Sequence, residues 1–365
     1  MLLQTATTSP DPQVNISVPA DAAAASRNPG LDGLRGVAAL SVALGHSVLQ
    51  VGGIGLWGSR LRDFPAMPWT DILVRLISAL APSDAAVIVF FVLSGHVLWS
   101  SFQRKNLRFL ADLPDYACAR LYRLFPLAIA SGLLLGLSLE ASARDLALNM
   151  LLLSHSLNGV LWSLQVEVVA SLSLFAVWGV TRATTWKLLL AFAISMGATA
   201  AFRGNPYIVF FPAFILGASI SLVPVRILQR RWIVAAAITV LILTNVILGH
   251  GGITRCFEMA AATILVGAVS RGQLQFLRSR TIMFLGAISY PFYLTHWVGL
   301  AAAGWIMDQL SLGSPYVGVA ITAAVSVTLT IPVAWLLHVG VETPALKARP
   351  RLPRGPGGRP ARLRT

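Results

Sequence analysis

Apolar residues in this 365-residue chain fall in long runs and do not alternate with polar ones. A helix needs about 20 apolar residues to cross a bilayer, whereas the strands of an outer-membrane barrel would show alternation. The pattern therefore predicts an all-α fold, a polytopic membrane bundle of about ten transmembrane helices. An additional run at 145–157 is too short to cross and is expected to be re-entrant or interfacial. The ten runs lie near residues 33–51, 84–102, 121–139, 162–181, 187–202, 207–223, 232–249, 255–270, 282–303 and 317–340.

Composition agrees with a membrane protein. The chain is 56% hydrophobic and 12% charged, against roughly a quarter charged in ordinary soluble domains, and its mean hydropathy is +0.73. These values exclude a soluble globular enzyme, a disordered protein and a disulfide-rich scaffold.

Basic residues are distributed unevenly between the loops on alternate sides of the predicted bundle. The chain has 28 Lys and Arg against 14 Asp and Glu, a net charge of +14. Ten crossings put 22 of the basic residues on the side of the two termini and six on the other side. Because loops rich in Lys and Arg stay in the cytoplasm, we expect both termini to be cytoplasmic, in a multi-pass protein of the cell inner (plasma) membrane. The positive charge then serves topology and binding to anionic membrane lipid, and no nucleic-acid partner is expected.

The two ends of the chain differ from its apolar middle. Residues 1–30 are polar and predict a disordered cytoplasmic N-terminal arm. Residues 346–365 contain Lys347 and six arginines among prolines and glycines. This composition predicts a basic, disordered cytoplasmic tail near the inner lipid surface.

Three ionisable side chains on separate spans are expected at one depth. At 1.5 Å per residue, His46 on the first span, Glu167 on the fourth and His296 on the ninth all fall in the outer half of the membrane. Ionisable groups inside a membrane are costly, so such groups are candidates for function. Each of them alone is also explained as a hydrogen-bonding group between helices. No set of His, Cys, Asp and Glu has the spacing of a metal site.

Arginines gather at the expected cytoplasmic ends of the first and third spans. Arg120 and Arg123 are three residues apart and so lie on one face of a helix. With Arg35 they form a set that can bind the phosphates of a ligand. A plain membrane anchor of the positive-inside kind explains the same three residues.

Six short motifs, in order, resemble those of the acyltransferase-3 family of membrane acyltransferases. The first is an arginine followed by ten residues and a histidine, here Arg35 and His46. Together the motifs cover about residues 31–345, which we take as the acyltransferase-3-like transmembrane domain. The segments are 31–39 (LDGLRGVAA) with His46, 90–95 (FFVLSG), 120–126 (RLYRLFP), 161–167 (LWSLQVE), 285–296 (LGAISYPFYLTH) and 341–344 (VETP).

The resemblance implies a ten-span fold with both termini cytoplasmic and an O-acyltransferase activity. It implies transfer of an acyl group, typically acetyl, from cytoplasmic acyl-coenzyme A to a hydroxyl of an exported or membrane-linked carbohydrate. Acetyl-coenzyme A is then a co-substrate, and no tightly bound cofactor or metal is expected. The implied roles are catalysis for His46 and Glu167, donor binding for Arg35, Arg120 and Arg123, and substrate binding for Trp162, Ser163, Tyr290, Tyr293 and His296.

In the implied mechanism His46 takes the proton of the acceptor hydroxyl, and Glu167 is a candidate to orient its imidazole. Tyr293, Ser163 and His296 are candidates to stabilise the oxyanion. The chain departs from the family pattern at His96, where an apolar or aromatic residue often follows the Ser-Gly pair. No soluble hydrolase-like domain is appended, so we expect the chain to act alone or with a separate periplasmic or extracellular partner.

Two other functions use the same intramembrane groups. A proton-coupled transporter or flippase of a glycan or acyl carrier also needs His and Glu within the membrane. A non-catalytic sensor that keeps the fold is a further alternative. The presence of both Arg35 and His46 argues against it. The acceptor itself is not readable from the sequence. The segment 52–83, with Trp57 and Trp69, suits either acceptor binding or anchoring at the membrane interface.

Overall fold

The computed structural model of the chain describes residues 28–138, 140–182, 184–309, 315–350 and 352. Within these ranges every regular element is a helix and no strand occurs, which confirms the all-α prediction. Most of the predicted N-terminal arm and tail lie outside the described residues. The longer elements are α2 (Pro29–Trp57), α3 (Trp69–Ala79), α4 (Ser83–Lys105), α5 (Phe109–Ser138), α7 (Leu161–Thr181), α8 (Thr185–Ala201), α12 (Arg231–Leu248), α13 (Gly252–Ser270), α15 (Ser289–Gln309) and α16 (Pro315–Leu337). The shorter ones are α6 (Ala143–Met150), α9 (Pro206–Val209), α10 (Phe211–Ala218), α11 (Val225–Leu228), α14 (Arg280–Ala287) and α17 (Thr343–Ala348), with single turns η1 (Leu61–Ala66), η2 (Ser219–Leu222), η3 (Gln275–Arg278) and η4 (His338–Glu342).

Seven helical segments of the described chain are long and apolar enough to cross a membrane. All ten predicted apolar runs lie on helices, so the helical membrane fold is confirmed, while the count of ten crossings stays a prediction. The run at 145–157 carries α6, whose eight residues rise about 12 Å, far less than a bilayer. The seven segments are Pro29–Trp57, Trp69–Lys105, Phe109–Leu137, Leu161–Thr181, Arg231–Leu248, Gly252–Ser270 and Pro315–Ala348.

The predicted runs 207–223 and 282–303 are each divided among shorter helices. The run 207–223 is divided among α9, α10 and η2. Pro212 lies in the first turn of α10, where its missing N–H prevents the preceding helix from continuing. The run 282–303 is divided between α14 and α15, and Pro291 stands in the first turn of α15.

Two further boundaries differ from the prediction. The helix predicted from 121 begins at Phe109, where the Asp112 carboxylate accepts a hydrogen bond from the backbone N–H of Arg108 (2.7 Å) and so caps the first turn. At the other end of the bundle, α2 continues past the predicted end at 51 to Trp57, with a kink at Gly53. Gly53 has φ +65°, a conformation in which a residue with a Cβ atom would be strained.

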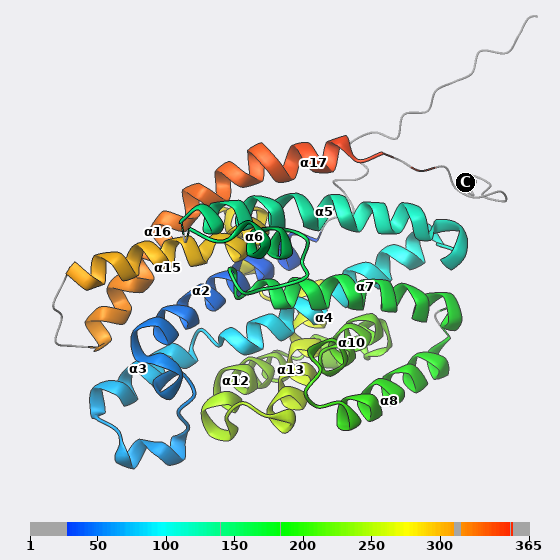
Figure 1. Cartoon of the computed structure of the whole chain (residues 1–365). Coiled ribbons are helices and arrows are strands. Elements are labelled where there is room, and N and C mark those ends of the chain that lie inside the picture. Colours follow the sequence, from blue (N-terminus) through cyan, green and yellow to red (C-terminus); the bar gives the residue numbers. More distant parts are fainter. Residues whose placement is uncertain (1–27, 139, 183, 310–314, 351, 353–365) are drawn as a thin grey trace, which may run out of the picture.

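Helix α2 runs through the middle of the molecule. It packs against α4, α13, α14, α15 and α16 (Figure 1). We call the end of the bundle that carries α3 and the end of α2 the α3 end. The α4–α5 and α7–α8 connections lie at the opposite end. One helix therefore connects the two ends and contacts these five helices on its way.

Helices α4 and α10 cross at very short range. A Cβ atom on Gly95 would lie 2.1 Å from the carbonyl oxygen of Phe214, and one on Gly217 would lie 2.0 Å from that of Val92. Such close backbone contact through small residues is typical of packed membrane helices. The glycine of the 90–95 motif thus has a packing role, and it fixes the helix that carries Ser94.

Candidate active site

His46 and His296 meet across the interface between α2 and α15. His46 Nδ1 and His296 Nε2 are 2.8 Å apart, and the two rings stack with their centroids 5.1 Å apart. His296 is fully buried, whereas His46 is half-buried. The predicted common depth of these two histidines thus corresponds to a direct contact.

The hydrogen bonds of the pair define which nitrogens carry protons. His296 Nδ1 lies 2.8 Å from the backbone carbonyl oxygen of Tyr293, and a carbonyl oxygen can only accept. His296 therefore carries its proton on Nδ1, and its Nε2 accepts the proton that His46 carries on Nδ1. This leaves His46 Nε2 with a free lone pair, as in a histidine that acts as a general base.

Two amide side chains fix α15 next to the histidines. Gln50 donates a hydrogen bond from Nε2 to the carbonyl oxygen of Leu300 (2.9 Å), and Asn158 donates from Nδ2 to that of Leu294 (2.9 Å). Trp297 covers His46 from the same helix, with ring centroids 5.2 Å apart. Its Nε1 is buried beside Gly159 and has no hydrogen-bond partner among the described residues.

Tyr293 and Ser163 bond to each other beside the histidine pair. Their hydroxyl oxygens are 2.7 Å apart, and the Ser163 hydroxyl donates to the carbonyl oxygen of Val160 (2.8 Å). Tyr293 is therefore the donor to Ser163, and both hydroxyl protons are in use. Trp162, which the sequence also predicts to bind substrate, packs between Phe91 and Phe210.

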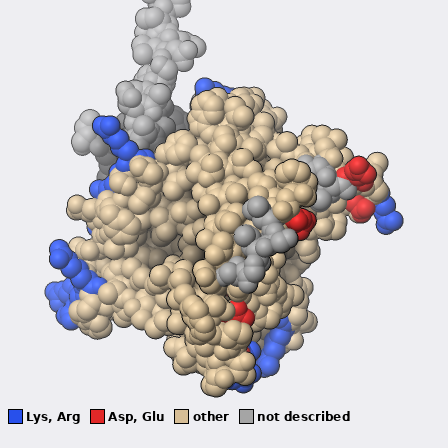
Figure 2. All heavy atoms as spheres, turned by 90° about the vertical axis from the view of Figure 1, so that its left-hand side faces the viewer, with Lys and Arg blue, Asp and Glu red and all other residues tan. Residues whose placement is uncertain are grey.

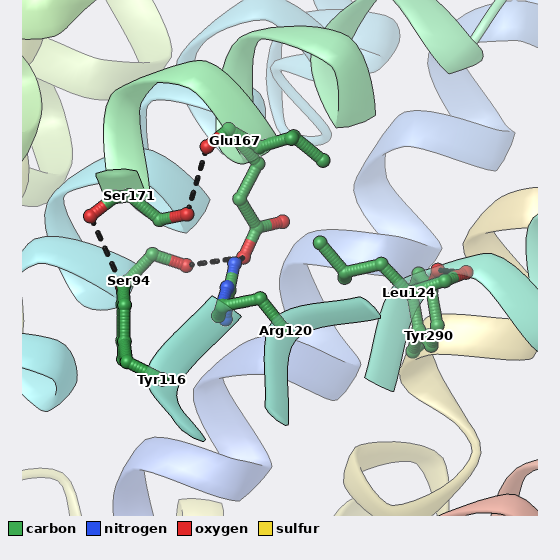
Figure 3. Close-up of polar contacts among 8 residues, drawn as sticks. Ser94, Tyr116, Arg120, Leu124, Glu167, Ser171 and Tyr290 are labelled. Atoms are coloured by element: carbon green, nitrogen blue, oxygen red, sulfur yellow. Dashed lines mark hydrogen bonds and ion pairs between the residues drawn. The ribbon is translucent and has the colours of Figure 1, made fainter. Parts of the chain in front are cut away.

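Glu167 forms an ion pair with Arg120. Arg120 Nη2 donates to Glu167 Oε1 (2.7 Å), and the hydroxyl of Ser94 donates to the same oxygen (3.1 Å). Figure 3 shows both side chains directed at this carboxylate. The pair is largely buried, with the Arg120 side chain 10% exposed. The group that orients His46 is therefore His296, whereas Glu167 holds Arg120.

The three predicted arginines, which we call the arginine cluster, lie close to one another but have different partners. Arg120 lies inside α5 and was expected to begin the span. Arg35 pairs with Asp32 (2.5 Å) on its own helix. Arg123 is half-buried and has no ion-pair partner in the described part of the chain. Its charge repels that of Arg35 and attracts that of Glu167.

Tyr290 belongs to this arginine cluster and not to the histidine pair. Its hydroxyl donates to the carbonyl oxygen of Leu124 (2.6 Å), next to Arg123 on α5. Arg35 and His46 are eleven residues apart on α2, a rise of about 16 Å. The predicted site residues thus form two groups at two levels of the bundle, the histidine pair and the arginine cluster.

Comparison with models of protein families identifies the family of this chain. The family model described as an acyltransferase domain (acyltransferase-3) matches residues 28–339. The chain belongs to the acyltransferase-3 family. No curated protein and no solved structure matches the chain. With its apolar helices, it is an acyltransferase-3 family membrane protein with a multi-pass fold.

Family membership explains the order of the motifs, and the geometry adds residues that the sequence did not single out. Ser94 was part of a motif but had no role, and Trp297 and Asn158 were not considered. The position of Trp297, directly after His296, was the only available signal for it. In the described ranges no group of three His, Cys, Asp or Glu residues could hold a metal ion.

Proposed function

We propose that the protein is an integral membrane O-acyltransferase. It would transfer an acyl group, acetyl in the first instance, from cytoplasmic acyl-coenzyme A to a hydroxyl of an exported or membrane-linked carbohydrate. The observation that carries this proposal is the chain of hydrogen bonds from the Tyr293 carbonyl through His296 to His46. This chain leaves a lone pair on His46 Nε2 in a half-buried position, where a hydroxyl can be deprotonated.

The proposed reaction is a single acyl transfer. As the acceptor oxygen attacks the thioester carbonyl, its proton moves to His46 Nε2, and the resulting imidazolium is held by its bond to His296. The carbon–sulfur bond then breaks and the leaving thiolate takes the proton from His46. A base placed in this way contributes roughly 10²–10⁴-fold to the rate.

The oxyanion of the tetrahedral intermediate needs a hydrogen-bond donor. Tyr293 and Ser163 have committed their protons to each other and to Val160, and His296 Nε2 acts as an acceptor. The Nε1–H of Trp297 is unpaired and its ring lies against His46. We therefore assign the oxyanion donor to Trp297.

The donor phosphates would bind at the arginine cluster. Arg123 is the cation without an ion-pair partner among the described residues, while Asp32 holds Arg35 and the Glu167 carboxylate holds Arg120 in place. The thioester must then reach His46, about 16 Å away along α2. A direct approach of the pantetheine arm through the bundle explains this separation more simply than a relay through acylated His46.

We propose ten crossings with both termini in the cytoplasm of a cell with an inner (plasma) membrane. The support is the distribution of basic residues, with 22 on the side of the termini and six on the other. In this orientation the α3 end lies outside the cell and the arginine cluster opens toward the cytoplasm, where coenzyme A is found.

The test is thiol release from acetyl-coenzyme A by the full-length protein in lipid nanodiscs, with a panel of oligosaccharide acceptors. We expect acceptor-dependent release by the wild type and a loss of at least about 10²-fold in His46→Ala at an unchanged protein level. Near-normal turnover by His46→Ala would remove His46 from the mechanism. Movement of a glycan across the membrane without loss of the thioester would favour a transporter or flippase instead.

A further inference from the structure

A second polar network lies at the α3 end, away from the histidine pair. His250, in the loop between α12 and α13, places Nδ1 2.5 Å from a carboxylate oxygen of Asp84 at the start of α4. Asn245 donates to the same oxygen (3.1 Å), and Arg75 donates to Asn245 (2.8 Å). Arg75 is itself tied to the carbonyl oxygen of Ser59 (2.9 Å). Side chains from three helices, α3, α4 and α12, therefore form the network that holds this imidazole in place.

The Asp84–His250 contact leaves a free nitrogen on the imidazole. The Asp84 carboxylate accepts the Nδ1 proton of His250, so Nε2 of the neutral ring keeps its lone pair. Asn245 Nδ2 also lies 3.1 Å from Nδ1, whereas Nε2 has no hydrogen-bond partner within the described residues and lies beside Gly58, at the end of α2. Such a carboxylate–imidazole arrangement is rigid and has one nitrogen left for a ligand.

His250 lines a cavity of about 670 Å³ at this end of the bundle. The volume falls in the range of small-molecule sites. The lining contains the carboxylates of Asp63 and Asp71 and the hydroxyl of Ser59, and no Lys or Arg. Across the α3 end, Lys and Arg gather toward the margin (Figure 2). The cavity thus offers acceptors of hydrogen bonds, which suits a ligand with many hydroxyl donors and not an anion.

Trp57 lies next to this cavity, on the other side of His250. Its ring stacks on His250, with centroids 4.2 Å apart and an interplanar angle of 18°. A flat aromatic ring next to hydrogen-bond acceptors packs well against the C–H face of a sugar ring. Trp57 and His250 together line a second, narrow cavity of about 20 Å³, which reaches Gly45 and is too small for a sugar ring. His250 is therefore the residue that joins Trp57 to the larger cavity.

We propose that the cavity at the α3 end is a saccharide-binding site, in which the Asp84–His250 pair accepts a sugar hydroxyl and Trp57 packs against a sugar ring. This inference rests on the proposed function and names the site of its acceptor. The described residues offer no metal-binding group of three, and the lack of basic lining residues disfavours a phosphate ligand.

The test is binding of the full-length protein in nanodiscs to an array of neutral and uronate-containing oligosaccharides. We expect Trp57→Ala and His250→Gln to lower the affinity for the bound glycans by about tenfold or more. Glutamine can retain the hydrogen bond to Asp84, so this variant keeps the network. Trp69→Ala is the matched control, because Trp69 is 70% exposed at the same end, lines neither cavity and, unlike Trp57, does not stack on His250; its affinity should be that of the wild type.

Two results would overturn the site: no glycan binding by the wild type, or equal binding by the wild type, Trp57→Ala and His250→Gln. Competition by spermidine and not by free sugars would also overturn it, in favour of a cation site. Acetyl-coenzyme A consumption, measured on the same samples, separates the two proposals. Glycan binding without any use of the thioester contradicts the acyltransferase proposal alone. Turnover with an unchanged acceptor KM in both variants contradicts the saccharide site alone.

Discussion

At the scale of single residues, the hydrogen bond between His46 and His296 gives the two imidazoles different tasks. His296 is buried and committed at both nitrogens, to the Tyr293 carbonyl and to His46. His46 has one nitrogen in use and one free. His296 therefore fixes the tautomer and the orientation of His46, as a partner group does for a ligating or catalytic histidine.

Replacing His296 tests this division. We expect His296→Phe to lower kcat by roughly 10²-fold, because His46 loses its acceptor and its ring is free to turn. His296→Gln should recover part of the rate, since the amide oxygen can accept the Nδ1 proton of His46. The measurement is kcat and KM for thiol release at saturating acceptor.

The control for these variants is Thr295→Val on the same buried turn of α15. The Thr295 hydroxyl donates only within its own helix, to Pro291 (2.8 Å), so this variant should keep kcat. Equal rates for His296→Phe and the wild type would contradict an orienting role for His296.

The sequence predicts which residues share a depth, but not which of them touch. His46, Glu167 and His296 were expected together, and only the two histidines are in contact. Depth follows from counting residues along a helix, whereas contact depends on how each helix is rotated about its axis. Arg120 was expected at a helix end because the polar segment 109–120 lowers the hydropathy there, yet it lies within α5 and meets Glu167.

At the scale of helices, glycines determine how closely the backbones of neighbouring helices approach each other. The crossing of α4 and α10 at Gly95 and Gly217 brings the two backbones into contact and fixes the helix that presents Ser94 to Glu167. The apolar runs predicted these helices, but hydropathy alone does not reveal the breaks at Pro212 and Pro291 or the partner of each glycine.

Gly95→Ala tests the crossing. The added Cβ atom would lie 2.1 Å from the Phe214 carbonyl oxygen. Because this oxygen belongs to the backbone, it cannot move away as easily as the end of a flexible side chain. We expect the free energy of unfolding to fall by about 1–3 kcal/mol, the usual cost of overpacking. Reversible unfolding in mixed micelles measures it.

Gly197→Ala, on α8, is the matched control. A Cβ atom there meets nothing within 4 Å, and alanine is favoured over glycine inside a helix by roughly 0.5–1 kcal/mol. This variant should be as stable as the wild type or more so. A Gly95→Ala protein as stable as Gly197→Ala would contradict the close crossing.

At the scale of the whole molecule, the two ends of the bundle have different chemistry. The arginine cluster lies toward one end, and the cavity with Asp63, Asp71 and His250 lies at the α3 end. In the proposed function, the donor binds at the cytoplasmic end and the acceptor at the outer end, in agreement with the expected cytoplasmic position of the basic loops.

Cysteine labelling tests this orientation. In a chain in which Cys118 and Cys256 are replaced by serine, Arg62→Cys and Ser279→Cys place single thiols at the two ends. Arg62 is 74% exposed on η1, and Ser279 is exposed before α14. A membrane-impermeant maleimide should label position 62 in intact cells, and position 279 only after the cells are opened. The reverse pattern would place the arginine cluster outside.

The course of α2 has a consequence for the choice of donor. Arg35, His46 and Trp57 follow one another at equal intervals of eleven residues, each close to three helical turns and about 16 Å of rise, with the kink at Gly53 in the second interval. In the proposed function, this spacing sets the distances between the site that binds the donor phosphates, the base and the site that binds the sugar. The acyl donor would then be selected by the length of the arm between its phosphates and its acyl group. A donor with a shorter arm would bind at the arginines, but its acyl group would not reach His46. A donor without phosphates could reach His46 but would not be bound by the arginines.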